Sequence, residues 1–120
     1  MKYPHKLFFL FLIIPSLSYA DWDKTDYVLG TTAVAALVVD WGQTRYIAKH
    51  PETHREMNIF LGEHPSVGRV NTYFGGVILG TVILANWLSP TNRKAFLGTI
   101  TAVELIVTHH NRGLGVKIAF

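Results

Sequence analysis

Apolar residues in this chain gather in blocks that are separated by short polar stretches. Three of the blocks are too long for a typical strand and lack the strict alternation of a half-buried strand: residues 27–39, 73–88 and 95–108. The pattern therefore predicts an all-α domain. Its three short helices are expected over about residues 25–48, 67–89 and 92–111.

Turn and capping residues support these helices. Ser66 follows Pro65 and is suited to accept a hydrogen bond from the first turn of the second helix. Thr91 follows Pro90 and is expected to cap the third helix in the same way, and that helix is expected to end near Gly113. The three helices are thus predicted to pack as one small bundle.

The first twenty residues have the three parts of a secretory signal peptide. A basic start precedes an unbroken apolar run, and small residues then occupy the two positions that signal peptidase needs: Lys2 and Lys6, residues 7–14, and Ser18 and Ala20. We expect cleavage of residues 1–20, which leaves residues 21–120 as one helical domain. The alternative is an uncleaved signal anchor, although the apolar run is short for a membrane span.

The composition favours a membrane protein. Apolar residues make up 49% and charged residues 16% of the chain, whereas soluble domains carry about a quarter charged residues. A full span takes about 20 apolar residues, so the first and third helices are long enough only if their polar ends face protein or water. The alternative is a soluble periplasmic bundle with two or three buried helices.

Basic residues set the expected orientation in the inner membrane, since cytoplasmic loops are enriched in Lys and Arg. The region between the first two apolar blocks carries four of them: Arg45, Lys49, Arg55 and Arg69. With this region in the cytoplasm, the N-terminus is periplasmic after signal cleavage and the C-terminus is cytoplasmic. Arg93 and Lys94 then lie on the periplasmic side, against the rule.

Charge and cysteine content exclude several functions. The net charge is +3, and no basic run or stripe provides a surface for nucleic acid. Without cysteine, the chain forms no disulfide and carries no thiolate metal site or lipoprotein anchor. No nucleophile elbow or phosphate-binding loop occurs, so an enzyme is not favoured.

Polar residues are expected to gather in the cytoplasmic half of the bundle. Helical spacing puts Asp40 on the same face as Thr44, and the residues at positions 104, 108 and 111 share a second face. The loop after the first helix adds further polar side chains. The candidate cluster comprises Asp40, Gln43, Thr44, Glu56, Asn58, His64, Glu104, Thr108 and Asn111.

Glu104 is the main functional candidate, because an ionisable residue inside a membrane helix is costly. Its expected partners are Gln43, Thr44, Arg45 or an arginine of the loop. Next to a second carboxylate, such a buried carboxyl group tends to keep a proton. The cluster is interpreted as a proton relay, a hydrophilic-ligand pocket or a metal site, or as a polar network that only fixes helix packing.

A metal or other cofactor is not expected. His109 and His110 are adjacent, so on a helix their side chains point about 100° apart. Neither of them belongs to a His-x-x-x-His or Glu-x-x-His pair that would complete a site. The other histidines are interpreted as solvated loop residues: His50, His54 and His64.

The region from 51 to 72 mixes turn formers with apolar anchors and is expected to fold against the helix ends. Three apolar residues are expected at that interface: Ile59, Phe60 and Leu61. In the second helix, Gly76 and Gly80 form a small-xxx-small pair, which lets two helix backbones approach closely in lipid. This pair is the candidate helix-packing face.

The end of the chain alternates between apolar residues and others. The apolar positions are Leu114, Val116, Ile118 and Phe120. This alternation is typical of the closing strand of an outer-membrane β-barrel. Because the three longer blocks lack the matching dyad pattern, a short terminal strand or an amphipathic tail is the alternative interpretation.

Three motifs lie within residues 40–74: Asp40-x-x-Gln43-Thr44, Glu56-x-Asn58-x-x-Leu61-Gly62-x-His64-Pro65-Ser66 and Val70-Asn71-x-Tyr73-Phe74. This stretch resembles small uncharacterised multi-helix membrane proteins of proteobacteria and their phages. The resemblance implies a helical membrane protein of bacterial or phage origin, with no assigned activity and no catalytic residues. If that group shares a site, the resemblance places it at Asp40, Gln43, Glu56, Asn58 and His64.

Three functions are expected from these observations. The first is a non-enzymatic inner-membrane component that binds a membrane-protein partner or assembles with itself. The second is a membrane-embedded enzyme or proton-coupled pocket that uses Asp40, Glu56 and Glu104. The third rests on the resemblance alone and is a phage-encoded lysis or envelope-modifying protein.

Overall fold

The computed structural model describes residues 21–120. This part of the chain forms three α-helices and no strand: α2 (Lys24–Lys49), α3 (Val67–Trp87) and α4 (Pro90–Gly113). The expectation of an all-α fold with three helices is therefore confirmed for the described residues. The predicted signal peptide, residues 1–20, lies outside them.

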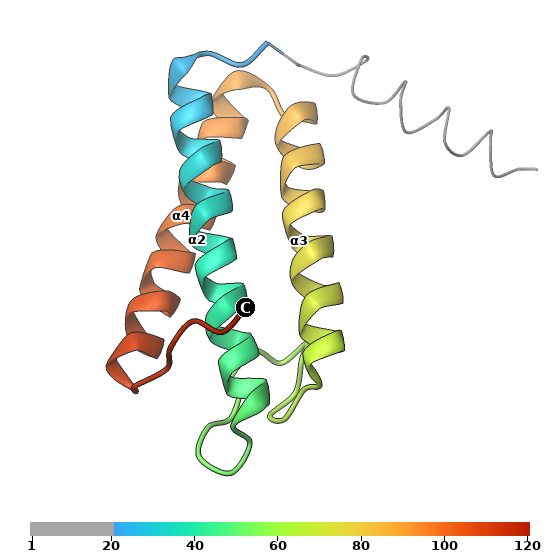
Figure 1. Ribbon diagram of the computed structural model, residues 1–120. Helices are drawn as coiled ribbons and strands as arrows, with labels where there is room; N and C mark the ends of the chain where they lie inside the picture. The colour runs from blue at the N-terminus through green and yellow to red at the C-terminus, as the bar shows by residue number, and fades with distance from the viewer. Residues whose placement is uncertain (1–20) are drawn as a thin grey trace, which may run out of the picture.

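α2 is the central helix of the bundle. It packs along α4 and α3, whereas α3 and α4 make few contacts with each other. In Figure 1, α2 and α4 cross closely and α3 stands apart from α4 along most of its length. Large parts of α3 are consequently uncovered by the rest of the chain.

Local capping explains where the helices begin. Asp23 and Asp26 form a capping box at the start of α2, in which each side chain accepts a hydrogen bond from the other residue's backbone N–H. Ser66 caps α3 as predicted, since its hydroxyl accepts from the Arg69 N–H at 3.1 Å. The predicted cap at Thr91 is wrong, because α4 already begins at Pro90. Proline suits the first helical position, where no N–H is needed.

The helices bury polar side chains and expose large apolar ones. The buried polar residues are Asp26, Asp40, Gln43, Thr44, Thr81 and Arg93. The exposed large apolar residues on the helices are Tyr27, Val28, Val38, Leu79, Val82, Leu84, Trp87, Val103, Leu105 and Ile106. Both features depart from the usual tendency in a soluble domain.

Only two small apolar clusters hold the bundle together within the described residues. One comprises Ala33, Ala85 and Leu97, against which Trp22 packs. The other comprises Leu61, Val70 and Phe74, against which Trp41 packs. The indole N–H groups fix the helices further, because Trp22 donates to Asn86 at 2.7 Å and Trp41 donates to Asn71 at 2.9 Å.

The C-terminal tail, residues 114–120, folds back over α2 rather than forming a strand (Figure 1). Val116 is buried, and the Ala119 N–H donates to the Gly42 carbonyl at 3.0 Å. The Phe120 ring meets Trp41 edge-on, with 5.7 Å between ring centroids. The tail therefore acts as an apolar strap on the helix.

Among residues 21–120, α3 is the one helix long and apolar enough to cross a membrane. At 21 residues it is about 31 Å long, which matches the hydrocarbon thickness of a bilayer. Only 17% of its apolar window is buried, so α3 differs from the core helix of a soluble protein. α2 and α4 carry more charged residues and do not meet the same criterion.

Candidate functional site

A polar pocket of ≈ 610 Å³ lies in the half of the bundle nearest the α2–α3 loop. Its polar lining combines six of the nine residues of the predicted cluster: Asp40, Thr44, Glu56, Asn58, Glu104 and Asn111. Tyr73 and His110 also line it and add a phenol and an imidazole that the prediction did not include. Helical spacing correctly grouped Asp40 with Thr44 and Glu104 with Asn111, whereas Gln43 and Thr108 line a different pocket.

Two carboxyl groups meet at this pocket. Asp40 of α2 and Glu104 of α4 lie within hydrogen-bonding contact, and the Thr44 hydroxyl donates to Asp40 Oδ1 at 3.2 Å. Asp40 is buried and Glu104 is half-buried. One proton between two such carboxyl groups removes their repulsion, as in other carboxylate dyads.

The partners predicted for Glu104 are therefore wrong in part. The Gln43 amide is instead held by α4, because its Nε2 donates to the Thr108 carbonyl at 3.0 Å and its Oε1 accepts from Asn111 Nδ2 at 3.1 Å. Arg45 donates to Asn71 and to the Ala119 carbonyl. These bonds lock α2, α3, α4 and the tail together rather than neutralising Glu104.

The α2–α3 loop brings two further polar groups to the pocket. Glu56 Oε1 accepts from the Met57 and Asn58 backbone N–H groups, both at 3.0 Å. Asn58 Nδ2 donates to the Tyr73 hydroxyl at 2.9 Å, which ties the loop to α3. Gly62 has φ of +79°, a conformation that other residues adopt at a cost, and closes the loop.

Not every predicted residue joins the site. His64 is exposed and does not line the pocket. Of the three loop residues expected against the helix ends, only Leu61 is buried there, whereas Ile59 is 87% and Phe60 is 70% exposed. Leu61 packs with Val70 and Phe74, whereas Ile59 and Phe60 line the polar pocket and stay exposed.

The opposite end of the bundle contains a charged centre that sequence reasoning did not find. Arg93 is fully buried, and its guanidinium donates to Asp26 Oδ2 at 3.0 Å and to the Ala85 and Leu88 carbonyls at the end of α3. Lys94 adds a second ion pair to Asp26, at 2.9 Å. The start of α2, the end of α3 and the start of α4 are joined at this point.

These contacts change the protonation of the aspartates. Burial acts to raise the pKa of Asp26, but hydrogen bonds from Lys94, from the Asp23 backbone and from Arg93 outweigh burial and lower that pKa to about 2. The hydrogen bond from Lys94 also lowers the pKa of Asp23. In turn, the hydrogen bonds to Asp23 and Asp26 raise the pKa of Lys94.

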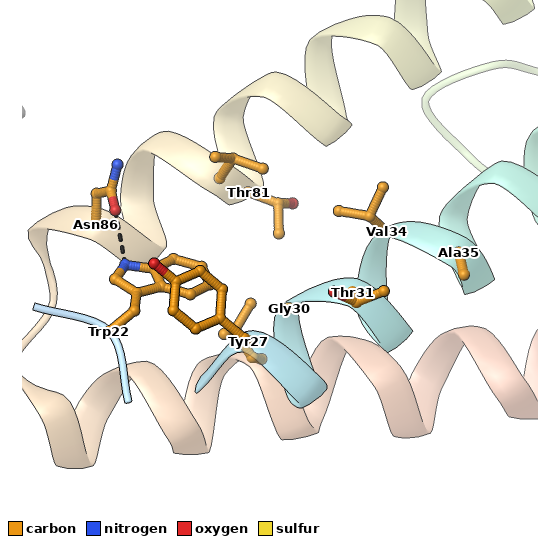
Figure 2. Close-up of a pocket in the computed structure, with 10 residues that line it drawn as sticks. Trp22, Tyr27, Gly30, Thr31, Val34, Ala35, Thr81 and Asn86 are labelled. Carbon is orange, nitrogen blue, oxygen red and sulfur yellow. Dashed lines mark hydrogen bonds between the residues drawn. The ribbon is translucent and has the colours of Figure 1, made fainter. Parts of the chain in front are cut away.

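A second, apolar pocket of ≈ 600 Å³ opens between α2 and α3 near the charged end. Figure 2 shows Trp22 and Tyr27 at one end of it, with the Trp22 indole bonded to Asn86, and Val34 and Thr81 farther along the two helices. Gly30 permits the close approach of Trp22, because a Cβ there would lie 2.7 Å from the indole ring.

The chemistry available in the polar pocket is hydrogen bonding and charge. Its carboxyl groups accept hydrogen bonds, and its amide and phenol groups donate or accept them. In residues 21–120, no group of three His, Cys, Asp or Glu side chains is placed to hold a metal ion. Comparison with models of protein families, with curated proteins and with solved structures finds no match for this chain.

Proposed function

We propose that this chain is a small integral membrane protein that acts as a non-enzymatic assembly component of the inner membrane. The observation that carries this proposal is α3, which has the length and apolarity of a span and leaves most of its apolar window uncovered. In water such a surface is unfavourable by about 25 cal/mol for each Å². In lipid, exposure of the same apolar surface carries no such free-energy penalty.

The arrangement of polar residues supports the same proposal for α2 and α4. Their charged side chains inside the bundle face one another, while residues such as Val28 and Ile106 face outward. Polar groups in a bilayer are tolerated when they face protein in this way. All three helices thus lie in the membrane, with the polar faces of α2 and α4 turned inward.

The proposed orientation has the α2–α3 loop in the cytoplasm and the start of α2 in the periplasm. Arg93 and Lys94 are at odds with the positive-inside rule when counted as free charges. Their ion pairs with Asp26 and Asp23 offset that charge on the proposed periplasmic side. The orientation also puts Arg45, Lys49, Arg55 and Arg69 on the cytoplasmic side.

The proposed assembly surface is the uncovered face of α3. Gly76 and Gly80 are exposed, and a Cβ at either position would meet nothing within 4 Å. The pair is open to a helix from outside the described chain, and small residues permit close helix contact in lipid. The occupant that we propose is a helix of a membrane-protein partner or of a second copy of the chain.

Single cysteines test the membrane placement, because the chain has no cysteine of its own. Val82→Cys lies on α3 beside the open apolar pocket and is 39% exposed, and Met57→Cys lies in the exposed part of the loop. We expect a maleimide that cannot cross membranes to label Met57→Cys only after the inner membrane is opened, and to leave Val82→Cys unlabelled until detergent is added. Labelling of Val82→Cys in intact membranes would contradict the proposal.

The polar pocket favours a second candidate, a membrane-embedded ligand pocket or proton-coupled site. Asp40, Glu56 and Glu104 all line it, and they come from α2, the loop and α4. A site built from three elements responds to movement of any one of them. Asp40→Asn and Glu104→Gln separate the two candidates, since a purely structural cluster loses abundance on substitution and a functional one loses phenotype at normal abundance.

A further inference from the structure

A third pocket, of ≈ 650 Å³, lies between α2, α4 and the C-terminal tail, and its charged lining is basic. His109 and Arg112 of α4 and Lys117 of the tail line this basic pocket, and no described acidic residue does so. The three basic side chains are exposed and form no ion pair within residues 21–120. At the opposite end of the bundle, by contrast, Lys94 is paired with Asp26. The basic pocket therefore presents positive charge that the described chain does not neutralise.

A buried hydrogen-bond donor also lines the basic pocket. Gln43 is 4% exposed, and α4 holds its side chain, since Nε2 donates to the Thr108 carbonyl and Oε1 accepts from Asn111. An amide nitrogen carries two N–H groups. The second N–H of Gln43 has no acceptor within residues 21–120. A buried donor without a partner is costly, so it marks a place where an acceptor from outside completes the structure.

Apolar and polar lining residues follow one another in the same direction along both helices. On α4, Leu105 is followed one turn later by His109 and two turns later by Arg112, on one face. On α2, Val39 is followed one turn later by Gln43. Both helices run toward the cytoplasm in the proposed orientation, so the apolar residues lie deeper in the bilayer than the donors. A phospholipid has the same polarity, with acyl chains in the hydrocarbon core and a headgroup at the surface.

We propose that the basic pocket binds an anionic phospholipid of the cytoplasmic leaflet, with its phosphate group at Arg112 and Lys117 and an acyl chain along Leu105 and Ile118. A guanidinium pairs with phosphate through two parallel hydrogen bonds, and an ammonium adds a compact charge. Leu105 is 52% and Ile118 is 56% exposed, so both are open to lipid. Basic pockets between membrane helices on the cytoplasmic side suit anionic headgroups. The inference rests on the proposed function, because it places this pocket at the cytoplasmic surface of a bilayer.

The C-terminal tail forms one side of the lipid site. Val116 is buried, and the Ala119 N–H donates to the Gly42 carbonyl at 3.0 Å. Lys117 and Ile118 lie between these two anchored residues, so the packing of the tail on α2 holds both of them at the pocket. The tail thus has a binding role in addition to its packing role.

Native mass spectrometry of the purified chain in detergent tests the inference, with phosphatidylglycerol as the probe. Phosphatidylcholine with the same acyl chains has a zwitterionic headgroup, and inorganic phosphate has the charge without the chains. We expect phosphatidylglycerol to bind about 25-fold tighter than phosphatidylcholine, since two permanent cations line the pocket and each contributes about fivefold. Excess inorganic phosphate is expected to leave the bound lipid in place.

Two variants and a matched control locate the lipid. Arg112→Gln and Lys117→Gln each remove one cation and are expected to weaken phosphatidylglycerol binding about fivefold. Lys49→Gln removes one cation from an exposed position on the same side of the membrane, outside the pocket, and is expected to leave binding unchanged. All three side chains are exposed, so the variants retain the fold.

Any of three results overturns the lipid inference. Equal binding of the two phospholipids indicates a lipid shell without headgroup recognition. An equal loss in Lys49→Gln and in the pocket variants indicates attraction by general surface charge. Displacement of the lipid by inorganic phosphate indicates a site for the free anion. A chain that resists an alkaline carbonate wash and gives any of these results retains the proposed function, whereas a chain that the wash releases loses the proposed function itself.

Discussion

Gly42 and Gly98 both lie inside helices, but their surroundings differ. A Cβ at Gly42 would lie 2.5 Å from Ile118 Cγ2 and 2.7 Å from the Phe120 ring, whereas a Cβ at Gly98 would meet nothing within 4 Å. Gly42 thus permits the C-terminal tail to lie on α2. Gly98 has no such role within the described chain.

Alanine at these two positions is expected to have opposite effects. Gly98→Ala should stabilise the fold by about 0.5–1 kcal/mol, because alanine is the better helix former. Gly42→Ala should lose that gain and loosen the tail, with a net cost of about 1–3 kcal/mol from overpacking. Chemical unfolding in detergent measures the stabilities, and carboxypeptidase digestion reports release of the tail. Equal stabilisation by both variants would show that the tail does not pack on Gly42.

The ionisation of Asp26 makes the stability of the fold depend on pH under acidic conditions. Its pKa of about 2 is below the ordinary value of 3.8, so its charge stabilises the fold above about pH 4. That contribution declines as the pH falls from 3.8 toward 2, where the folded carboxylate becomes protonated. Asp23 adds to the effect in the same direction, because its pKa is also lowered.

The variant Asp26→Asn is expected to be less stable at pH 7, because the buried Arg93 loses its ion pair with Asp26. Between pH 4 and pH 2, its unfolding temperature should fall less than that of the unmodified chain. Far-UV circular dichroism in detergent measures both curves, and the exposed loop variant Glu52→Gln serves as a control. If the unfolding temperatures of the unmodified chain and of Asp26→Asn fall equally between pH 4 and pH 2, Asp26 does not cause the loss of stability in acid.

Among the helices, α3 is the one on which the proposed membrane placement depends. Leu79 lies near its middle and is 60% exposed, whereas the exposed Thr72 lies near its start. If α3 crosses the bilayer, these positions have different environments. Leu79 is near the hydrocarbon centre, and Thr72 is near the interface, where a long basic side chain reaches water.

Arginine at these two positions is therefore expected to act differently. Leu79→Arg should reduce membrane insertion by about 2.5–3.5 kcal/mol, the usual cost of arginine at the centre of a span. Thr72→Arg should insert almost as well as the unmodified chain. The readout is the membrane-integrated fraction of each expressed variant. A soluble bundle would tolerate both substitutions about equally, since both sites are exposed.

Much of the fold follows from sequence at this scale. The apolar blocks and the turns at Ser66 and Pro90 predict three helices, whose observed ends lie within two residues of the expected ones. The start of α4 was misjudged, because Pro90 and Thr91 are both good first-turn residues and sequence gives no backbone angles. The conformation of the C-terminal tail could not be decided from the sequence either, since alternating apolar residues suit both a strand and an extended segment that packs on a helix.

For the whole molecule, the candidate site was predictable only in part. Spacing along α2 and α4 predicted the helix faces that carry Asp40 and Glu104. The rotation of one helix relative to the other cannot be predicted from the sequence of either helix alone. Glu104 consequently meets Asp40 instead of the amide or arginine that was expected. Tyr73 was missed because its place in the pocket depends on how the loop folds, and His110 was missed because its place depends on the rotation of α4.

The Arg93 centre could have been found from sequence. Asp23 and Asp26 begin the first predicted helix, and Arg93 and Lys94 begin the third. In a three-helix bundle with short connections, the starts of the first and third helices lie at the same end. That argument predicts that the acidic and basic residues form ion pairs. The positive-inside rule counts each charge separately, so by that rule Arg93 is an exception.

The central claim is that this bundle resides in the bilayer, with its polar residues inside and its apolar side chains outside. Fractionation of cells that express the chain, on a density gradient and with an alkaline carbonate wash, tests it most directly. We predict that the chain stays in the inner-membrane fraction after the wash. Release into the wash would contradict the claim and indicate a peripheral or periplasmic bundle whose exposed apolar faces are covered by another protein.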